Sequence, residues 1–307
     1  MISDQAKLSE NLVFIPNAKV INESIYSASR LPVLSLTRPG ALRGTLASSV
    51  RDSLRRIRSP EVRVSRDCIW VTDDWSHNYY HWILDVAPKI EYFCAHTGMK
   101  NFSIALPQHH AENKFVQESL DAFKAKIVKV VPGLTYHFSN LIGVKHLGYG
   151  DAALWHQIKK RFFVHFGIRR RSPLKIYISR ADTDTRRIAN ESSVTKVLKK
   201  LDFSSLVLSK LRFRDQLEIF HNARIITGMH GAGLVNTVFS SPGSAVLEFR
   251  PSVSNNICFE YIASKMSLNH YLLKVDSDSK TNIVRSEYII DIGALREHVE
   301  VLCRSPR

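Results

Sequence analysis

The sequence predicts an α/β protein with two Rossmann-like domains, and three observations lead to this fold class. The chain has 307 residues, enough for two domains of about 100–200 residues each. In its second half, five short apolar segments alternate with segments of helical spacing, as in a parallel α/β sheet. Residues 68–131 repeat this β-α-β rhythm more weakly.

The domain boundary is predicted just before Pro173, which biases Ser172 towards an extended conformation. A basic amphipathic helix is expected to precede this proline. This boundary divides the chain into three predicted segments: an N-terminal domain, a C-terminal domain and a terminal helix that could cross back to the first domain. Their bounds are 1–170, 171–290 and 291–307.

The N-terminal domain is expected to alternate short apolar strands with helices. Pro88 is placed in the first turn of a helix, where proline is tolerated. The first 65 residues are harder to assign, because proline, glycine and serine interrupt their β-prone pieces. The expected strands are 11–15, 31–36, 68–72, 103–106 and 127–131, and the segments of helical spacing are 51–58, 78–86, 111–124 and 155–167.

The C-terminal domain has a cleaner pattern. Each apolar strand candidate is followed by a polar or glycine-containing turn and then by a helix candidate. The expected strands are 175–179, 206–208, 224–227, 245–249 and 271–275, and the expected helices are 190–201, 215–222, 234–239, 255–266 and 292–303.

The composition is that of a globular protein with a strong basic excess. Hydrophobic residues make up 44% of the chain and the formal net charge is +15. Such an excess suits an anionic partner, which could be a nucleotide, a lipid diphosphate, an anionic membrane surface or nucleic acid. Nucleic acid is disfavoured because no zinc-finger, helix-turn-helix or RNA-recognition signature accompanies the charge. The densest basic clusters, Lys159–Arg161 and Arg169–Arg171, also fit a solvated surface.

Three features lead us to expect a cytoplasmic location. No apolar run reaches the roughly 18–20 residues that cross a bilayer. The N-terminus lacks the basic-then-apolar order of a secretory signal. The four cysteines form no C-x-x-C pair, so we expect reduced thiols and neither disulfides nor structural zinc. Peripheral contact with the inner face of an anionic membrane stays open.

The most informative segment is Thr227–Leu234, with the sequence TGMHGAGL. It follows an apolar strand and precedes a helix, whose first N–H groups would favour phosphate. His230 adds a side-chain donor. Gly231, Ala232 and Gly233 would let a ligand approach the backbone, with glycine also free to take a positive φ. The spacing G-x-x-G-x-G differs from the dinucleotide fingerprint G-x-G-x-x-G, which counts against a nicotinamide or flavin enzyme. The alternative is a tight turn whose glycines serve packing only.

Other polar residues of this domain follow its strands at their carboxyl ends, where ligands of open α/β sheets bind. Glu248 could accept hydrogen bonds from the two hydroxyls of a ribose. Arg180 could bind a diphosphate through two N–H donors without the help of a metal. Arg187 and Asn190 follow nearby. The alternatives are a surface salt bridge for Glu248, solvated guanidinium groups, and a helix cap for Asn190.

His81 and Asp85 are the candidate acid–base residues. On a helix they share a face, and a carboxylate beside an imidazole fixes its tautomer and raises its basicity. Packing of a helix rich in aromatic residues is the alternative. No metal site is expected, because Asp73–Asp74 lacks a D-x-D spacing and His109–His110 has no carboxylate cluster nearby. The sequence also lacks G-x-S-x-G, Walker and H-E-x-x-H motifs, which counts against hydrolases, nucleoside triphosphatases and zinc proteases.

Five strings of residues occur in a fixed order between residues 68 and 251. They are Tyr80-His81-Trp82-x-x-Asp85; Ser179-Arg180 with Arg187-x-x-Asn190-Glu191; Gln216-x-x-x-Phe220-x-x-Ala223; Gly228-x-His230-Gly231-Ala232-Gly233-Leu234-x-Asn236; and Glu248-Phe249-x-Pro251. Together they resemble glycosyltransferase family 61. This family includes plant xylosyl- and arabinosyltransferases, animal protein-O-linked N-acetylglucosaminyltransferases and bacterial capsular-polysaccharide proteins.

The resemblance implies a GT-B architecture, with two Rossmann-like domains facing each other across a cleft. It also implies an inverting transfer from a nucleoside-diphosphate sugar, a UDP-sugar by preference, with no metal or other cofactor. The acceptor, a glycan, a polysaccharide or a lipid-linked saccharide, would bind the first domain near His81 and Asp85. The short chain is more similar to the bacterial capsule proteins. The donor site would be Arg180, His230, Gly231, Gly233 and Glu248 on the second domain.

Two other functions stay open from the sequence alone. A polysaccharide pyruvyltransferase could use a similar two-domain scaffold with phosphoenolpyruvate as its donor. A non-catalytic module that binds polyanions or nucleic acid would also suit the basic charge. The sequence does not encode which sugar or acceptor is used, since single hydroxyl contacts discriminate between sugars.

Overall fold

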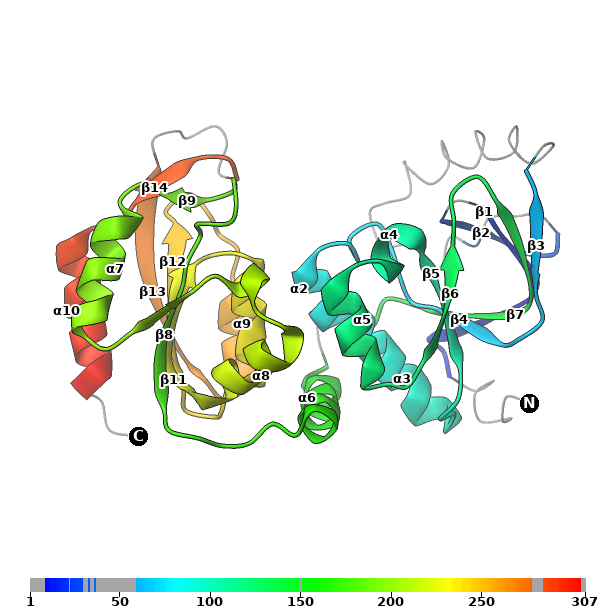
Figure 1. The fold of residues 1–307 in the computed structure, drawn as a ribbon, viewed down its shortest axis with the longest axis horizontal. Coiled ribbons are helices and arrows are strands. Elements are labelled where there is room, and N and C mark those ends of the chain that lie inside the picture. The colour runs from blue at the N-terminus through cyan, green and yellow to red at the C-terminus, as the bar shows by residue number, and fades with distance from the viewer. Residues whose placement is uncertain are drawn as a thin grey trace. The chain divides into compact units, whose positions relative to one another are not determined.

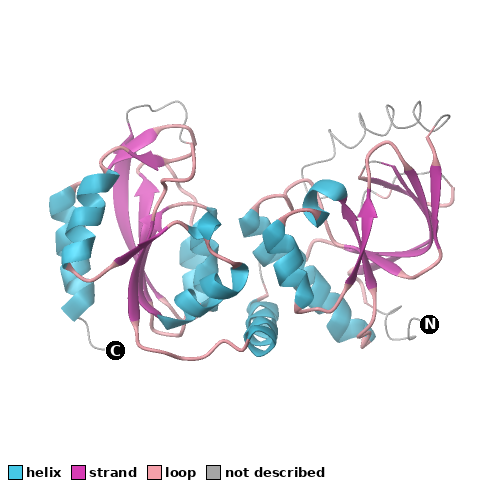
Figure 2. Cartoon of the chain, in the orientation of Figure 1, coloured by secondary structure: helices cyan, strands magenta, loops and turns pink. Residues whose placement is uncertain are grey.

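The computed structural model describes residues 9–21, 23–29, 33, 36, 59–148, 151–277 and 284–304. The chain forms two compact units, and each has its own sheet flanked by helices (Figures 1 and 2). The units meet between residues 162 and 163, inside helix α6 (Ala152–Phe166), and not at the predicted boundary at residue 170. The expected helical segment 51–58 and most of the expected strand 31–36 lie outside the described residues.

The sheet of the first unit is mixed, whereas the sequence predicted a Rossmann-like sheet. Strands β4, β5 and β6 are parallel to one another and β7 is parallel to β4, as the β-α-β rhythm indicated. Strand β1, however, runs antiparallel to both β7 and β2. The strands are β1 (Leu12–Ile21), β2 (Ser24–Tyr26), β3 (Glu61–Val64), β4 (Cys68–Trp70), β5 (Ser103–Pro107), β6 (Lys126–Val130) and β7 (Thr135–Val144).

The ten-residue strand β7 was not predicted, although it pairs with β1, β3 and β4. His137, Ser139 and Asn140 interrupt its apolar residues, so the sequence shows no clean alternation. All seven strands contribute side chains to one core, which includes Trp70 and Phe138. This shared core buries the apolar side of the antiparallel strands.

The helices of the first unit follow β4 and β5. Pro88 lies in the first turn of α3, as predicted. The segment before α3 begins with one α-helical turn and continues as a π-helix, a form that is rare and often found at functional sites. These elements are α2 (Tyr79–His81), the π-helix η3 (Trp82–Val86), α3 (Ala87–Thr97), α4 (Gln108–Ala111) and α5 (Lys114–Asp121).

The second unit has a largely parallel sheet with the order β10-β8-β11-β12-β13-β14-β9. Numbered by their place in the chain, its five main parallel strands have the order 2-1-3-4-5 of a doubly wound fold. The sheet order therefore reverses between β8 and β11. The strands are β8 (Leu174–Ile178), β9 (Arg187–Ile188), β10 (Ser204–Leu206), β11 (Ala223–Met229), β12 (Ala245–Pro251), β13 (Asn269–Ser277) and β14 (Glu287–Ile289).

Helices cover both faces of this sheet, with α7 and α10 on one face and α8 and α9 on the other (Figure 1). The terminal helix α10 stays in the second unit, because Leu295, Val299 and Leu302 are buried in the core of that unit. It does not return to the first domain, the alternative that the sequence had left open. The elements are α7 (Glu191–Lys200), the 3-10 helices η4 (Leu208–Lys210) and η5 (Ala232–Phe239), α8 (Phe213–Asn222), α9 (Cys258–Lys265) and α10 (Ile292–Arg304).

Within the described part of the chain, no helix is both long enough and apolar enough to span a bilayer. The four cysteines are free thiols in the structure. Burial raises the pKa of the Cys68 thiol to about 12 and that of Cys94 to about 11. These two thiols are therefore inert at neutral pH.

Candidate functional site

The point where the strand order reverses is the place where doubly wound sheets bind ligands, beyond the carboxyl ends of the two strands concerned. Here those strands are β8 and β11, which pair in register at Ile178 and Gly228. Arg180 and His230 each come two residues after that pair. Two residues predicted for the donor site therefore lie side by side at this position.

The three glycines of the TGMHGAGL segment serve close packing, and none of them has a left-handed backbone. A Cβ atom at Gly231 would lie 2.9 Å from Nη1 of Arg180, so the arginine packs directly over this residue. Gly231 is itself extended, with φ 172° and ψ 173°. A Cβ at Gly228 would lie 3.0 Å from Cβ of Ile178, and one at Gly233 would lie 2.9 Å from Leu208. The segment thus lets β11 and Arg180 approach closely.

A second arginine, Arg186, joins Arg180 at this site. Its Nη1 donates to the carbonyl oxygen of His230 over 3.4 Å. Arg180 donates to the hydroxyl and carbonyl oxygens of Thr185. In both arginines the Nε–H is buried and has no hydrogen-bond partner among the described residues. A buried donor without a partner is uncommon in proteins and indicates a missing acceptor.

The electrostatics of the two arginines would favour an anion as this acceptor. Burial, followed by the charge of Arg186, lowers the pKa of Arg180 from its ordinary value. Burial likewise lowers the pKa of Arg186. Two guanidinium groups that disfavour each other's charge would both be stabilised by a phosphate between them. Arg186 also has a left-handed backbone, φ 49°, fixed by a 2.8 Å hydrogen bond to Val284. Such strained conformations concentrate at functional sites.

The sequence pointed to Arg187, and the structure places it elsewhere. Arg187 lies on strand β9, where its side chain is 59% exposed and forms an ion pair of 3.8 Å with Glu287. Its neighbour Ile188 is buried. Arg186 precedes this strand and has a left-handed backbone, so the alternation of side chains along a strand does not extend to it. No local pattern of the sequence therefore distinguished Arg186 from Arg187.

Glu248 is fully buried on β12, and both of its carboxylate oxygens are occupied. His230 Nδ1 lies 2.5 Å from Oε1, and His270 Nε2 lies 2.8 Å from Oε2. Arg250 donates to both oxygens, through Nε over 3.0 Å and a terminal nitrogen over 2.7 Å. Arg250 also pairs with Glu260 over 2.8 Å. This network crosses β11, β12 and β13.

The network changes the role of Glu248 from that predicted. Burial acts to raise its pKa, but hydrogen bonds from His230, His270 and Arg250 outweigh this and hold the pKa well below its usual range. A carboxylate with 0% exposure and no free oxygen cannot also contact a ribose. Glu248 instead holds the His230 ring through Nδ1, which leaves Nε2 as the ring nitrogen available to a ligand.

Asn190 and Glu191 also have structural partners. The Asn190 side chain makes two hydrogen bonds to the backbone of Ile290, of 2.8 and 3.0 Å, and does not cap helix α7. It thereby ties the start of α7 to the segment before α10. Glu191 accepts hydrogen bonds from the Arg180 backbone N–H, 2.9 Å, and from Tyr177, 2.8 Å. Asn190 is therefore not placed as a ligand contact, while Glu191 fixes the backbone that carries Arg180.

In the first unit, the structure brings His81 and Asp85 together as predicted. His81 Nδ1 lies 2.8 Å from Oδ2 of Asp85. A second histidine, His146, has its Nε2 at 3.9 Å from the other Asp85 oxygen. All three side chains are 12–15% exposed. With Nδ1 held by the carboxylate, Nε2 of His81 is the nitrogen that can take a proton from a substrate.

The loop before His81 is fixed by a buried ion pair. Lys89 Nζ lies 3.2 Å from Asp73, and both side chains are 1% exposed. Asp73 also accepts from the Trp75 backbone N–H over 3.0 Å and from Ser76 over 3.1 Å. Burial acts to raise the pKa of Asp73, but Lys89 and these hydrogen bonds lower it overall. Asp73 therefore shapes the turn, the role that its sequence favoured over metal binding.

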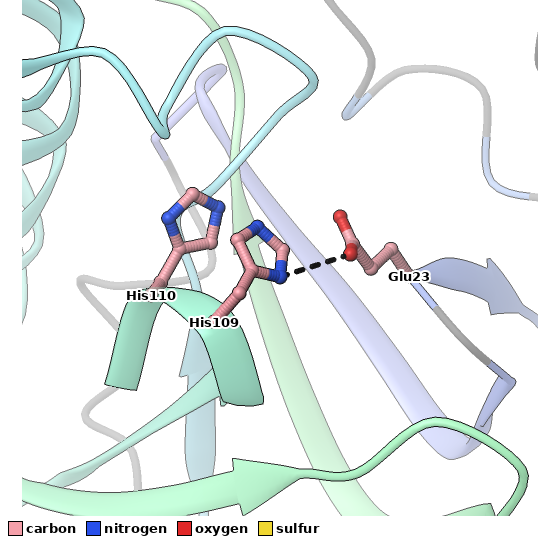
Figure 3. A group of neighbouring side chains, drawn as sticks. All are labelled: Glu23, His109 and His110. Carbon is pink, nitrogen blue, oxygen red and sulfur yellow. Dashed lines mark ion pairs between the residues drawn. The ribbon is translucent and has the colours of Figure 1, made fainter. Parts of the chain in front are cut away.

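The sequence predicted no carboxylate cluster near His109 and His110, and the structure places a single carboxylate beside them. Glu23 lies beside them, with Oε1 at 3.5 Å from His109 Nδ1 (Figure 3). The sequence hides this contact because it comes from tertiary pairing. Strand β5 pairs with β6 up to Val130, four residues separate β6 from β7, and the start of β7 pairs with the end of β1. The turn after β1 therefore lies beside α4.

Part of the basic cluster is neutralised by neighbouring groups. Arg161 makes two hydrogen bonds to Glu91, of 2.5 and 3.1 Å, and Arg171 donates to Glu218 over 2.7 Å. Arg170, Arg171 and Arg224 line a cavity of about 150 Å³ in the second unit. The charge of this region is thus distributed between ion pairs and a basic hollow.

The family of the chain follows from its comparison with known proteins. Residues 79–247, more than half of the chain, match the family described as Glycosyltransferase 61. The chain belongs to this family. As a family 61 member it is a glycosyltransferase, which excludes the pyruvyltransferase and the non-catalytic binding module that the sequence had left open. The match includes His81, Asp85, Arg180, Arg186 and the TGMHGAGL segment.

Several animal enzymes are similar to this glycosyltransferase over 135 residues, which is 41% of the chain. They are named EGF domain-specific O-linked N-acetylglucosamine transferase. The Rattus norvegicus enzyme is 30% identical, the Bos taurus enzyme 29% and the Gallus gallus enzyme 27%. The matched region spans 25% of the length of each of these relatives.

Proposed function

We propose that this family 61 glycosyltransferase moves a sugar from a nucleoside-diphosphate donor to an acceptor hydroxyl, with inversion at the anomeric carbon. The observation that carries the proposal is the pair Arg180 and Arg186 at the switch point of the second sheet. Their buried Nε–H groups have no partner in the described chain, and their positive charges are close together. A diphosphate supplies both the acceptor oxygens and the negative charge that this site needs.

The leaving group would be stabilised by these residues as the glycosidic bond to the diphosphate breaks. Arg180 and Arg186 would bind the diphosphate oxygens, and Nε2 of His230 would add a further contact. Such fixed donors stabilise charge that develops in the transition state. Because two guanidinium groups supply the positive charge, the proposal needs no metal ion at the diphosphate.

The acceptor hydroxyl would be activated in the first unit. The acceptor oxygen forms the new bond to the anomeric carbon while its proton passes to Nε2 of His81. Asp85 holds the His81 ring from the other nitrogen and stabilises the imidazolium that results. His81 is then the base and Asp85 its positioning residue. The proposal assigns the donor to the second unit and the acceptor to the first, the division of roles expected of a GT-B enzyme.

The choice of donor and acceptor rests on the relatives and on charge. The names of the animal relatives state the transfer of N-acetylglucosamine, so UDP-N-acetylglucosamine is the first donor to test. A glycan, polysaccharide or lipid-linked saccharide is proposed as the acceptor. The basic hollow around Arg170 and Arg224 would suit an anionic membrane surface close to such an acceptor. A cytoplasmic location remains a prediction from the sequence.

A thermal-unfolding panel of nucleoside diphosphates and sugar nucleotides, with and without EDTA, tests the proposal. A ligand at 100 times its Kd adds about 2.7 kcal/mol of stability, or a rise of a few degrees for a chain of this size. We expect such a rise with one nucleotide base, unaffected by EDTA and absent in Arg180→Gln. No rise with any nucleotide, in folded protein, would contradict the proposal. A rise that EDTA abolishes would contradict its metal-independent form.

A further inference from the structure

We propose that Glu23, His109 and His110 in the first unit form a binding site for one divalent transition-metal ion, zinc by preference. The site goes beyond the proposed glycosyl transfer and shares no residue with it. Among the described residues these three are the group whose potential ligand atoms, one from each side chain, all lie within 4.8 Å of one another. Figure 3 shows His109 and His110 projecting from α4, with Glu23 across from His109.

The distances require only a small closure around an ion. Zinc binds imidazole nitrogens and carboxylate oxygens at roughly 2.0–2.2 Å, so neighbouring ligand atoms in a tetrahedral site lie about 3.3 Å apart. The Glu23 Oε1 to His109 Nδ1 distance is already 3.5 Å. Glu23 and His109 are about half exposed, 50% and 52%, so their side chains can rotate to shorten the remaining distances.

The third ligand, His110, is a buried side chain. Its side chain is only 3% exposed, and in the described part of the chain its ring has no hydrogen bond. The centroid of its ring lies 4.0 Å from that of the His109 ring and 6.3 Å from that of the Trp82 ring. Buried polar side chains normally have a partner. A metal ion would supply one for His110 and would explain why two histidine rings lie together beside a carboxylate.

The kind of ion follows from the donor atoms. Two imidazoles and one carboxylate suit zinc and its neighbours in the first transition row, whereas magnesium and calcium prefer oxygen ligands throughout. Three protein ligands leave one tetrahedral position for water or for an oxygen of a bound molecule. His77 and Asp74 also act electrostatically on Glu23.

The ion would fasten two segments that are far apart in the sequence. Glu23 lies in the turn between β1 and β2, and the histidines lie on α4, directly after β5. Within the described residues, the His109–Glu23 contact is the ion pair between this turn and α4, and it is solvent-exposed. Exposed ion pairs contribute little stability on their own. A bound zinc ion would connect the β1–β2 turn to α4 more strongly than this ion pair does.

The test measures zinc binding by the full chain after chelator treatment and removal of the chelator. Competition with a chromogenic zinc chelator gives the affinity and the number of ions bound, and thermal unfolding gives an independent readout. The wild-type chain should bind one zinc ion and unfold a few degrees higher with zinc than without it. Excess magnesium should not displace the ion.

Two substitutions at the exposed ligands avoid disturbing the core. Glu23→Gln and His109→Asn should each weaken zinc binding by at least the roughly 10–100-fold that is lost even with an outer-sphere partner. The control His156→Asn removes an exposed histidine of α6 and should bind zinc as the wild type does. No zinc binding by the wild type would overturn the proposal, as would equal binding by all four proteins. None of these measurements uses a sugar nucleotide, so the proposed transfer reaction is tested separately.

Discussion

The two units each hold a histidine against a carboxylate, and the two pairs are built for different tasks. His81 and Asp85 are one helical turn apart, partly exposed, and joined over 2.8 Å. His230 and Glu248 come from neighbouring strands, are buried, and are joined over 2.5 Å. The second Asp85 oxygen lies 3.9 Å from His146 Nε2, whereas Arg250 and His270 form hydrogen bonds of 2.7 and 2.8 Å to the second Glu248 oxygen. In the proposed reaction the first pair serves proton transfer, whereas the second pair is a buried structural contact.

The largest effect on turnover should come from the His81–Asp85 pair. Replacing His81 by Asn should lower the turnover of the sugar donor by about 10²–10⁴-fold, because general base catalysis is lost. Asp85→Asn should have a smaller effect in the same direction. Nucleotide affinity should stay the same in both variants, since their contacts are in the first unit.

Steady-state kinetics and nucleotide titrations check this prediction. His96→Asn is the matched control, because His96 is an exposed histidine on α3 that bonds only its own helix. Unchanged turnover in both His81→Asn and Asp85→Asn would refute the catalytic assignment.

The buried pair should show its effect in stability. Glu248→Gln leaves Arg250 without its buried counter-charge, and breaking a buried pair in this way costs about 3–5 kcal/mol of the free energy of unfolding. Glu260→Gln removes the 41% exposed partner of the same arginine and should cost only about 0–1 kcal/mol. Urea unfolding of the two variants measures the difference. Equal costs would show that the Glu248 network does not stabilise the second unit.

A third histidine, His110, is buried without a carboxylate bonded to it. We expect it to make the free energy of unfolding depend on pH. Burial, and then the charges of His109 and His77, lower its pKa to about 4, although Asp73 acts in the opposite sense. Between about pH 6.5 and pH 4 the unfolded chain binds a proton at this residue and the folded chain does not. The free energy of unfolding should therefore fall as the pH is lowered through this range, by at most about 1.4 kcal/mol per pH unit.

The pH dependence is measured by urea unfolding in the presence of a chelator, so that no metal competes with the proton. His110→Asn should remove this part of the slope. Glu248 acts in a lower range: its pKa is depressed in the folded state, so its contribution is present at neutral pH and is lost below about pH 4. A slope between pH 4 and 6.5 that is the same in wild type and His110→Asn would contradict the prediction.

Local patterns were enough to predict most elements of the second unit. Apolar strands that alternate with helices gave its sheet, and the placing of Arg180 and His230 at strand ends gave their meeting point. The first unit was harder because its sheet depends on antiparallel pairing between β1 and β7, which are more than one hundred residues apart. Such pairing leaves little trace in a local window of sequence.

The site predictions failed where tertiary contacts decide a role. Glu248 lies near the end of a strand, where ligands of such sheets bind. Its carboxylate, however, is hydrogen-bonded by His270 from the neighbouring strand and by Arg250 from its own strand. Arg187 was preferred to Arg186 because the left-handed turn at Arg186, which directs that side chain to His230, depends on a backbone bond to Val284. His81 and Asp85 were predicted because their contact depends on helical spacing alone.

The measurement that tests the account most directly is calorimetric titration of UDP and other nucleoside diphosphates into the wild type, Arg186→Gln and Arg187→Gln. Arg186 faces the proposed diphosphate site, and Arg187 is an exposed neighbour with the same charge. Loss of a charge-assisted hydrogen bond of about 1.5–3 kcal/mol should weaken binding roughly ten- to hundredfold in Arg186→Gln. Arg187→Gln should bind as the wild type does. Equal affinities of Arg186→Gln and the wild type, or a loss confined to Arg187→Gln, would contradict the proposed donor site.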